Sequence, residues 1–384
     1  MSNEIKINPM KRLMVRFCGP GKHQLLRTSL FCIVLSLLAG AILLLSLGKN
    51  PFVAYGSILQ GAGCLPKLRY PGRKNQLTDL LSLLNYATPM VFASLSVAIA
   101  LKCGLFNICV SGMMVLSGVM ATVLVGYNPS ISAPLARILV VLIGILFGGA
   151  LGALIGWLKY RFNMNEVVVA IMFNYIISYI VSFFIRTDFI DPVTRQSVEI
   201  GQNARLTLMD VQAFGLRMNI TLVMPLAIIC IFLIRFLLQR TRLGFELKAV
   251  GSNRKASRYA GMKVGRTMII TMVISGALAG LAGVSYYLGS YASIQPRVVP
   301  SLGFDAIAVA LLGNSTPVGC FFASLLVMIF NSGTTYMSSR LGVLREIASL
   351  ITSILLLFSA CGVFFRSLAG RYYGEILDSE AKHE

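Results

Sequence analysis

Residues 240–263, RTRLGFELKAVGSNRKASRYAGMK, form the one long polar segment between the strongly apolar blocks in the C-terminal half of the chain. Positions 235–266 hold nine Lys and Arg residues against a single acid, Glu246. Basic segments that adjoin membrane spans are retained on the cytoplasmic side. This stretch therefore predicts a membrane protein with a cytoplasmic loop here, and it sets the orientation of the spans on either side.

The same loop carries the start and stop signals of a short helix. Ser252 or Asn253 can cap a helix, and Gly261 can end one in a left-handed turn. One face of the two turns between them is formed by Ala256, Tyr259 and Ala260. We expect a short helix along the membrane surface, with small residues where a partner can dock. The alternative is a basic loop that only fixes the orientation of the chain in the membrane. Residue spacing alone is consistent with both interpretations.

The composition is that of a membrane protein. Of the 384 residues, 56% are hydrophobic and only 12% are charged, about half the charged fraction of average soluble domains. Several continuous apolar runs approach the roughly 20 residues that cross a bilayer as a helix, and they do not alternate as barrel strands would. The expected fold is an all-α polytopic membrane protein with eight to ten transmembrane helices, at least one of them broken or re-entrant.

The net charge of +20 does not indicate nucleic-acid binding, because much of it lies beside membrane spans. Residues 235–266 carry +8 and residues 1–27 carry +5. Basic residues in such positions fix the orientation of the chain and contact anionic lipid. We therefore exclude nucleic acid as a partner and expect membrane lipid instead.

The chain divides into a basic cytoplasmic tail (residues 1–28), a transmembrane domain (residues 29–366) and a second cytoplasmic tail (residues 367–384). The polar segment 187–217 is expected outside. Residues 67–74 also fall outside although they are basic, which runs against the positive-inside bias. The sequence does not explain this basic external segment.

Apolar runs predict seven spans in the first three quarters of the chain, at residues 30–47, 80–101, 105–126, 134–158, 166–185, 219–238 and 267–288. After them, residues 302–313 are too short for a straight crossing. Residues 302–336 are thus either two spans or a re-entrant pair, and a last span follows at 347–365. A broken helix is tolerated only where protein or a water-filled cavity surrounds it.

Small residues recur every four positions in two of these spans. Three overlapping GxxxG units are formed by Gly144, Gly148, Gly152 and Gly156. A shorter stripe is formed by Ser275, Ala279 and Gly283. Because small residues let helix backbones approach closely, we expect both stripes to serve helix packing.

Polar side chains inside apolar segments are the candidates for a transport path. Asn107 and Ser111 are spaced i, i+4, so we expect them to share one face of an apolar helix. Asn174 lies two turns into the span at 166–185, and Phe304 and Asp305 open the short run at 302–313. A polar group at bilayer depth must face protein or water. The alternatives are interhelical hydrogen bonds for the amides and the hydroxyl, and a helix-start position for Asp305.

Four segments resemble one family of membrane proteins. In chain order they are ATPMVFASLSVAIALKCGLFNICVSG (87–112), NMNEVVVAIMFNYI (163–176), LGFELKAVGSNRKASRYAGMKVGRTMIITMVISGALAGLAG (243–283) and GFDAIAVALLGNSTPVG (303–319). They are similar to the permease family of ABC importers for nucleosides, simple sugars and branched-chain amino acids. The nucleoside and simple-sugar branch is the most similar.

The resemblance implies a permease subunit of an ABC importer in a bacterial cytoplasmic (inner) membrane, working by alternating access. Nucleosides are the first choice of solute, simple sugars such as ribose the second, and branched-chain amino acids the third. The implied partners are an ABC ATPase subunit, a second permease that is identical or paralogous, and an extracytoplasmic substrate-binding protein or lipoprotein.

The resemblance also assigns residues. The implied substrate path comprises Asn107, Ser111, Asn174, Phe304 and Asp305. The implied ATPase-coupling loop comprises Glu246, Ala249, Gly251, Asn253, Ala256, Tyr259 and Gly261.

The sequence predicts neither catalysis nor a bound cofactor. GPGKHQ at residues 19–24 lacks the spacing and the Ser/Thr of a Walker A loop, so ATP and Mg are expected on the partner ATPase. No CxxC or Cys/His pairing indicates a metal site. A self-contained secondary carrier or channel would need an intramembrane ion site, and a membrane enzyme would need a reactive constellation. We find neither pattern, and both classes stay as alternatives.

Overall fold

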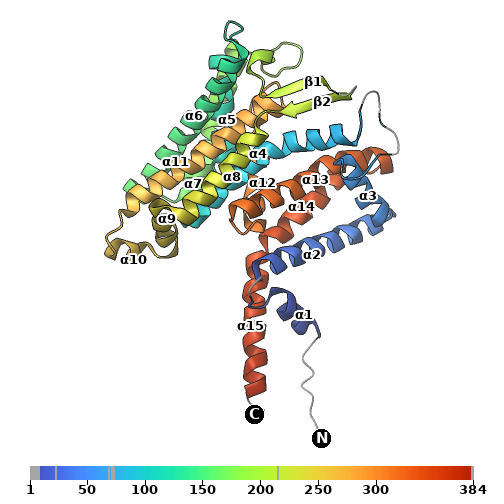
Figure 1. Cartoon of the computed structure of the whole chain (residues 1–384), viewed down its shortest axis with the longest axis vertical. Coiled ribbons are helices and arrows are strands. Elements are labelled where there is room, and N and C mark those ends of the chain that lie inside the picture. The colour runs from blue at the N-terminus through green and yellow to red at the C-terminus, as the bar shows by residue number, and fades with distance from the viewer. Residues whose placement is uncertain (1–8, 22–23, 68–69, 71–73, 214–215, 382–384) are drawn as a thin grey trace.

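The computed structural model describes the chain except for residues 1–8, 22–23, 68–69, 71–73, 214–215 and 382–384, and its described part is mainly helical (Figure 1). The α-helices are α1 (Pro9–Cys18), α2 (Gln24–Ser46), α3 (Pro51–Gly61), α4 (Gln76–Lys102), α5 (Val110–Ala121), α6 (Ala133–Phe162), α7 (Glu166–Asp188), α8 (Met224–Arg240), α9 (Arg242–Ser252), α10 (Arg254–Tyr259), α11 (Val264–Ser285), α12 (Leu302–Leu312), α13 (Pro317–Leu341), α14 (Arg345–Ala360) and α15 (Gly362–Ala381). Short π-helical turns extend α5 at Thr122–Gly126 and α11 at Tyr286–Ser290.

The predicted polytopic helical class is confirmed. Within the described residues, six helices are long and apolar enough to cross a membrane, and there are up to eight if each of two bent helix pairs is one span. The bent pairs are α8 with α9, at 73°, and α14 with α15, at 45°. Two further apolar helices, Val110–Gly126 and Leu302–Leu312, are shorter than these spans.

The centre of the molecule is α4, whose most apolar window is 89% buried. It packs against α11, α12 and α13. From Ala87 to Ala100 every side chain is buried, as expected of a helix that is apolar on all sides. The expected broken helix is present as α12, which is only 11 residues long and ends before α13 begins at Pro317.

The four glycines of α6 lie against α11. A Cβ atom at Gly148 would overlap the carbonyl oxygen of Gly276, and one at Gly152 would overlap that of Met272. Gly144 faces Val284, 2.9 Å from where its Cβ would be, and Gly156 faces Met272 at 3.0 Å. The two backbones are therefore in direct contact, an arrangement that adds dispersion energy where lipid gives no hydrophobic drive.

The polar segment after α7 contains a β-hairpin that was not predicted from the sequence. β1 (Thr207–Ala213) and β2 (Leu216–Thr221) form an antiparallel hairpin. The predicted span at 219–238 was wrong at its start, because Asn219 belongs to β2 and α8 begins at Met224. Residues 216–221 alternate apolar and polar side chains, which is the period of a strand and not of a helix.

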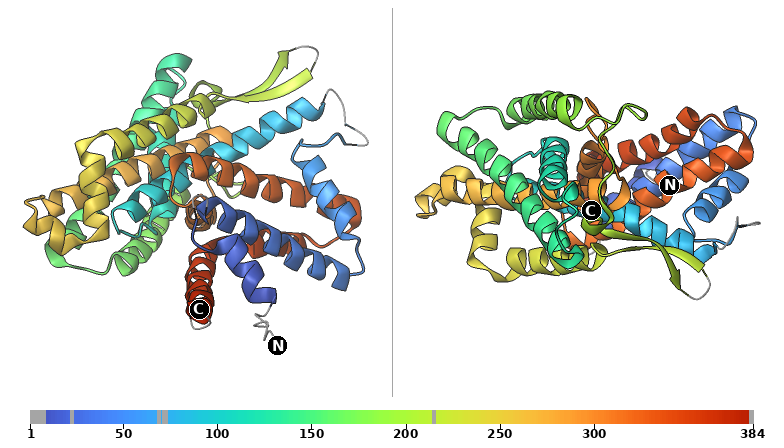
Figure 2. Two further views of the ribbon diagram at one scale, coloured as in Figure 1. Left: turned by 60° about the horizontal axis from the view of Figure 1, so that its bottom comes forward. Right: turned by 90° about the horizontal axis from the view of Figure 1, so that it is seen from above.

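The remaining helices form a flank to one side of this core (Figures 1 and 2). α14 packs on α2, and α13 packs on α3. A separate apolar cluster joins them, formed by Leu44, Ala54, Ile58, Met337, Ala348 and Ile351. α1 packs against α15, and both project away from the other helices.

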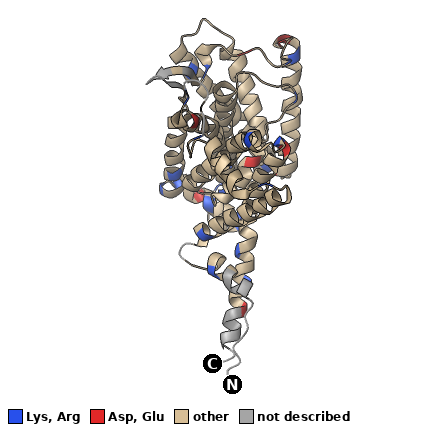
Figure 3. Cartoon of the chain, turned by 90° about the vertical axis from the view of Figure 1, so that its right-hand side faces the viewer, with Lys and Arg blue, Asp and Glu red and all other residues tan. Residues whose placement is uncertain are grey.

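Charged residues are sparse on the helical body (Figure 3). Of the unexplained basic segment 67–74, Lys67 forms an ion pair with Asp79 at 2.6 Å, and its ammonium lies 4.9 Å from the ring centroid of Tyr336. Arg69 and Arg73 lie outside the described residues. The charge of Lys67 is thus balanced within the chain, by an acid in the first turn of α4.

Candidate functional site

The basic loop folds into two helices that together form one compact element. α9 begins at Arg242 after its N-cap residue Thr241, whose hydroxyl accepts a hydrogen bond from the Gly244 amide at 3.1 Å. Leu247 and Val250 of α9 are fully buried. The sequence reading predicted one helix here and missed α9, although its apolar residues recur at helical spacing.

The second helix, α10, is the one that the sequence predicted. The side chain of Asn253 caps it, accepting hydrogen bonds from the amides of Lys255 at 3.0 Å and Ala256 at 3.1 Å. Gly261 ends the segment with φ at +79°, so both the cap and the left-handed stop are confirmed. Tyr259 is 93% exposed, and the small residues beside it are exposed too. α10 therefore offers an uncovered surface.

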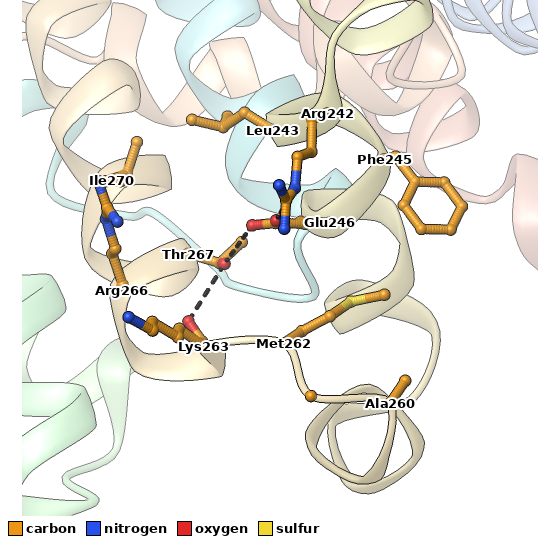
Figure 4. Close-up of a pocket in the computed structure, with 11 residues that line it drawn as sticks. Arg242, Leu243, Phe245, Glu246, Ala260, Met262, Lys263, Arg266, Thr267 and Ile270 are labelled. Carbon is orange, nitrogen blue, oxygen red and sulfur yellow. Dashed lines mark hydrogen bonds and ion pairs between the residues drawn. The ribbon is translucent and has the colours of Figure 1, made fainter.

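A recess of about 600 Å³ lies between the loop and the start of α11 (Figure 4). Its one acid among the described lining residues is Glu246, which accepts hydrogen bonds from Arg242 Nε at 3.2 Å and from Thr267 Oγ1 at 3.4 Å. Lys263 and Arg266 add exposed positive charge. Glu246 is thus held inside a basic rim, and the recess suits an acidic surface.

The loop also contacts residues 103–109, the irregular segment between α4 and α5, which we call the break. Gly251 packs on the backbone so closely that a Cβ atom there would overlap the carbonyl oxygen of Lys102. Gly104 faces Gly251 and has φ at +66°. The guanidinium of Arg254 donates a hydrogen bond to the Gly104 carbonyl at 2.8 Å. α9 and α10 are therefore in direct contact with this break.

Asn107 lies in the break, not on a helix. The expected i, i+4 face that it shares with Ser111 was wrong, because α5 begins only at Val110. Asn107 is buried, donating a hydrogen bond to Ser275 Oγ of α11 at 2.8 Å and accepting one from the Cys109 amide at 3.0 Å. Its side chain thus joins the break to the helix that follows the loop.

Ser111 and Asn174 are buried and bonded on the other side of the break. Ser111 Oγ donates to the Pro300 carbonyl at 2.8 Å. Asn174 Oδ1 accepts from the Gly112 amide at 2.7 Å, and its Nδ2 donates to the Ile108 carbonyl at 3.1 Å. The two side chains tie the start of α5 to α7 and to the segment before α12.

Phe304 and Asp305 lie in the first turn of α12, whose Gly303 packs directly on Ser111. Phe304 is 45% exposed, and Asp305 is half-buried. The break is therefore surrounded by Asn107, Ser111, Asn174 and α12. Phe304 and Asp305 of α12 are the more exposed side chains of this group.

Two residues that contact the break, Ser275 and Arg254, were not predicted as part of the site. Ser275 was read as a small packing residue, yet its hydroxyl bonds Asn107 and lies 3.0 Å from Ser96 Oγ. Arg254, which bonds the Gly104 carbonyl, was counted only among the nine basic residues of positions 235–266. Among the described residues, no group of three or more His, Cys, Asp and Glu side chains could hold a metal ion.

Known proteins match the chain along most of its length. Residues 80–360 match the family described as branched-chain amino acid transport system / permease component. The nucleoside ABC transporter permease protein NupB of Lactococcus lactis subsp. cremoris (strain MG1363) is 35% identical over 341 residues, 86% of this chain and 89% of that protein.

Two further relatives bear related names. The guanosine ABC transporter permease protein NupP of Bacillus subtilis (strain 168) is 33% identical, over 89% of this chain and 95% of that protein. The glucose ABC transporter permease protein TsgB13 of Haloferax volcanii is 26% identical, over 88% of this chain and 88% of that protein.

Proposed function

Because this chain belongs to the family of branched-chain amino acid transport system permease components, we propose that it is the permease subunit of an ABC importer for nucleosides. Nucleosides are proposed as the solute because the sequence is 35% and 33% identical to permeases named for nucleosides and guanosine. Each match covers more than 85% of both chains. A sugar importer is the second candidate, supported by the glucose permease at 26% identity.

The arrangement of the basic loop supports a role in coupling to an ATPase partner. α10 presents an exposed aromatic ring, Tyr259, beside small residues, and aromatic side chains are enriched among the anchors of protein interfaces. The basic rim around Glu246 would attract acidic groups on that partner. ATP and Mg would bind to the ATPase and not to this chain.

The contacts of the loop suggest how its movement would reach the membrane core. A displacement of α10 would move Arg254 and Gly251, which contact Gly104. The same segment carries Asn107, whose hydrogen bond to Ser275 would transmit the displacement to α11. Packed backbone and hydrogen bonds transmit displacement because such contacts have few alternative arrangements. In this view, Asn107, Ser111 and Asn174 hold the break in one state of the alternating-access cycle.

Phe304 and Asp305 are the path residues best able to meet solute in the present state, since both are partly open. The complete importer would contain two permeases, identical or paralogous, and an extracytoplasmic substrate-binding protein or lipoprotein. We place the chain in a bacterial cytoplasmic membrane with residues 240–263 and both tails (1–28 and 367–384) inside, and with residues 187–217 outside.

The test is uptake of labelled guanosine by cells with and without this gene. Excess unlabelled nucleosides should block the gene-dependent uptake, and ribose and leucine should not. A second arm removes the ATPase gene of the same transport system. Uptake that persists without the ATPase would contradict an ABC importer and favour a secondary carrier. Gene-dependent uptake of ribose but not guanosine would move the solute class to sugars.

A further inference from the structure

A pocket lies at the end of α11 that is farthest from the basic loop. Its volume is about 290 Å³, and its walls include Tyr286, Tyr287, Tyr291, Gln196, Ser293 and Gln295. None of the described residues that line it carries a charge. Small-molecule pockets start at about 300 Å³, so this one suits a small, neutral ligand.

The three tyrosines form an aromatic corner. The ring centroids of Tyr286 and Tyr291 are 4.6 Å apart, and those of Tyr286 and Tyr287 are 5.0 Å apart at an interplanar angle of 82°. Tyr287 is buried, whereas Tyr291 is 48% exposed. The corner thus has a fixed inner ring and an outer ring with a free surface.

The surrounding structure holds this corner in place. Tyr286 and Tyr287 begin the π-helical turn Tyr286–Ser290, a wide turn that is frequent at functional sites. Tyr287 packs directly on Gly118 of α5, where a Cβ atom would overlap the ring. Ser290 Oγ donates to the Asn85 carbonyl of α4 at 3.4 Å. A site supported in this way loses little entropy when a ligand binds.

The polar groups in the wall suit the edge of a planar heterocycle. The amides of Gln196 and Gln295 each offer donors and an acceptor, and Gln196 Oε1 accepts a hydrogen bond from Ser293 Oγ. Aromatic rings bind bases through their faces, while amides bind the edges. A phosphate would find no counter-charge in this wall, which favours a nucleoside over a nucleotide.

The pocket lies on the side from which an importer receives its solute. α11 has 22 residues and is therefore roughly 33 Å long, so its ends reach opposite faces of a bilayer. If the basic loop is cytoplasmic, the tyrosines face outward. Pro300, which also lines the pocket, accepts the hydrogen bond of Ser111. The pocket is thus joined to the break described above.

We propose that this pocket is an outer binding site for the base of an incoming nucleoside. The base stacks on Tyr291 and Tyr286, and its edge bonds the amides of Gln196 and Gln295. This inference rests on the proposed function, because it specifies where the permease of such an importer would first hold its solute. Loss of one stacking ring weakens binding of a base by roughly 5- to 150-fold.

The experiment measures guanosine uptake kinetics in cells that carry the complete transport system. Tyr291→Leu should raise the KM at least about fivefold, and Tyr291→Phe should stay near the wild type because the ring remains. Gln295→Leu, at an exposed position, should raise the KM without removing a ring. The matched control is Tyr179→Leu, on an exposed tyrosine of α7, with uptake normalised to the amount of membrane-inserted protein.

The outcomes separate the two proposals. An unchanged KM in both Tyr291→Leu and Gln295→Leu, with wild-type guanosine uptake intact, overturns the pocket and leaves the nucleoside importer standing. An equal rise in Tyr291→Leu and Tyr291→Phe also overturns it, because stacking would not be the cause. Absence of guanosine uptake in the wild type instead overturns the proposed function, and this inference with it.

Discussion

The contact of Gly251 with the backbone of Lys102 and Cys103, where α4 ends and the break begins, allows a direct test of the proposed coupling route. In Gly251→Ala, the new methyl group would overlap the Lys102 carbonyl oxygen and come within 3.0 Å of the carbonyl carbons of Lys102 and Cys103. Carbon atoms normally pack about 3.5–4.0 Å apart. The two backbones must therefore separate by roughly 0.5–1 Å.

The expected cost follows from this separation. Overpacking a tight contact costs about 1–3 kcal/mol, which corresponds to a shift of roughly 5- to 150-fold in a two-state equilibrium. Alanine is also a better helix former than glycine by about 1 kcal/mol, so the helix itself would gain. A net loss of transport would thus come from the contact and not from a weakened α9.

The assay is guanosine uptake per inserted permease, together with ATP hydrolysis by the reconstituted importer. We expect uptake to fall at least about fivefold, with hydrolysis less affected because the exposed face of α10 is unchanged. The control is Gly56→Ala, on a helical glycine of α3 with no atom within 4 Å of the added Cβ. Wild-type uptake in a fully inserted Gly251→Ala protein would refute the route through the break.

Three other changes test neighbouring features. Asn253→Ala removes the cap of α10, which costs about 1 kcal/mol, and should lower uptake; uptake at the wild-type level would argue against α10 as a coupling helix. Tyr259→Ala should reduce the amount of ATPase that co-purifies with the permease, and unchanged recovery would remove Tyr259 from the interface. Gly148→Leu should cut the yield of folded protein, because its side chain has no room beside Gly276; a normal yield in size-exclusion chromatography would contradict the described packing.

Local features of the fold could be predicted from the sequence because their causes are local. Asn253 caps α10 through amides two and three residues ahead, and Gly261 ends the turn by its own backbone freedom. The glycine stripe of α6 is periodic, so its packing role could be read as well, although its partner helix could not. The hairpin was missed because Asn219 was counted into an apolar run.

The partners of the polar residues could not be predicted, because they lie far away in the chain. Asn107 bonds Ser275 across 168 positions, and Ser111 bonds the Pro300 carbonyl across 189. The i, i+4 spacing of Asn107 and Ser111 indicated a helix, yet α4 ends before Gly104, which has a positive φ, and Asn107 lies in irregular chain. The tyrosine pocket depends in the same way on a wide turn and on Gln196, which is distant in sequence.

The pairing of α1 with α15 has a consequence for the parity of membrane crossings. The ring of Phe31, near the start of α2, lies 5.5 Å from that of Phe365 in α15, and Arg366 donates a hydrogen bond to Asn314 at 3.2 Å. The first and last described helices, α1 and α15, thus lie beside each other. We therefore expect both ends on one face of the membrane and an even number of crossings, so that reporter enzymes fused to either end give the same compartment signal.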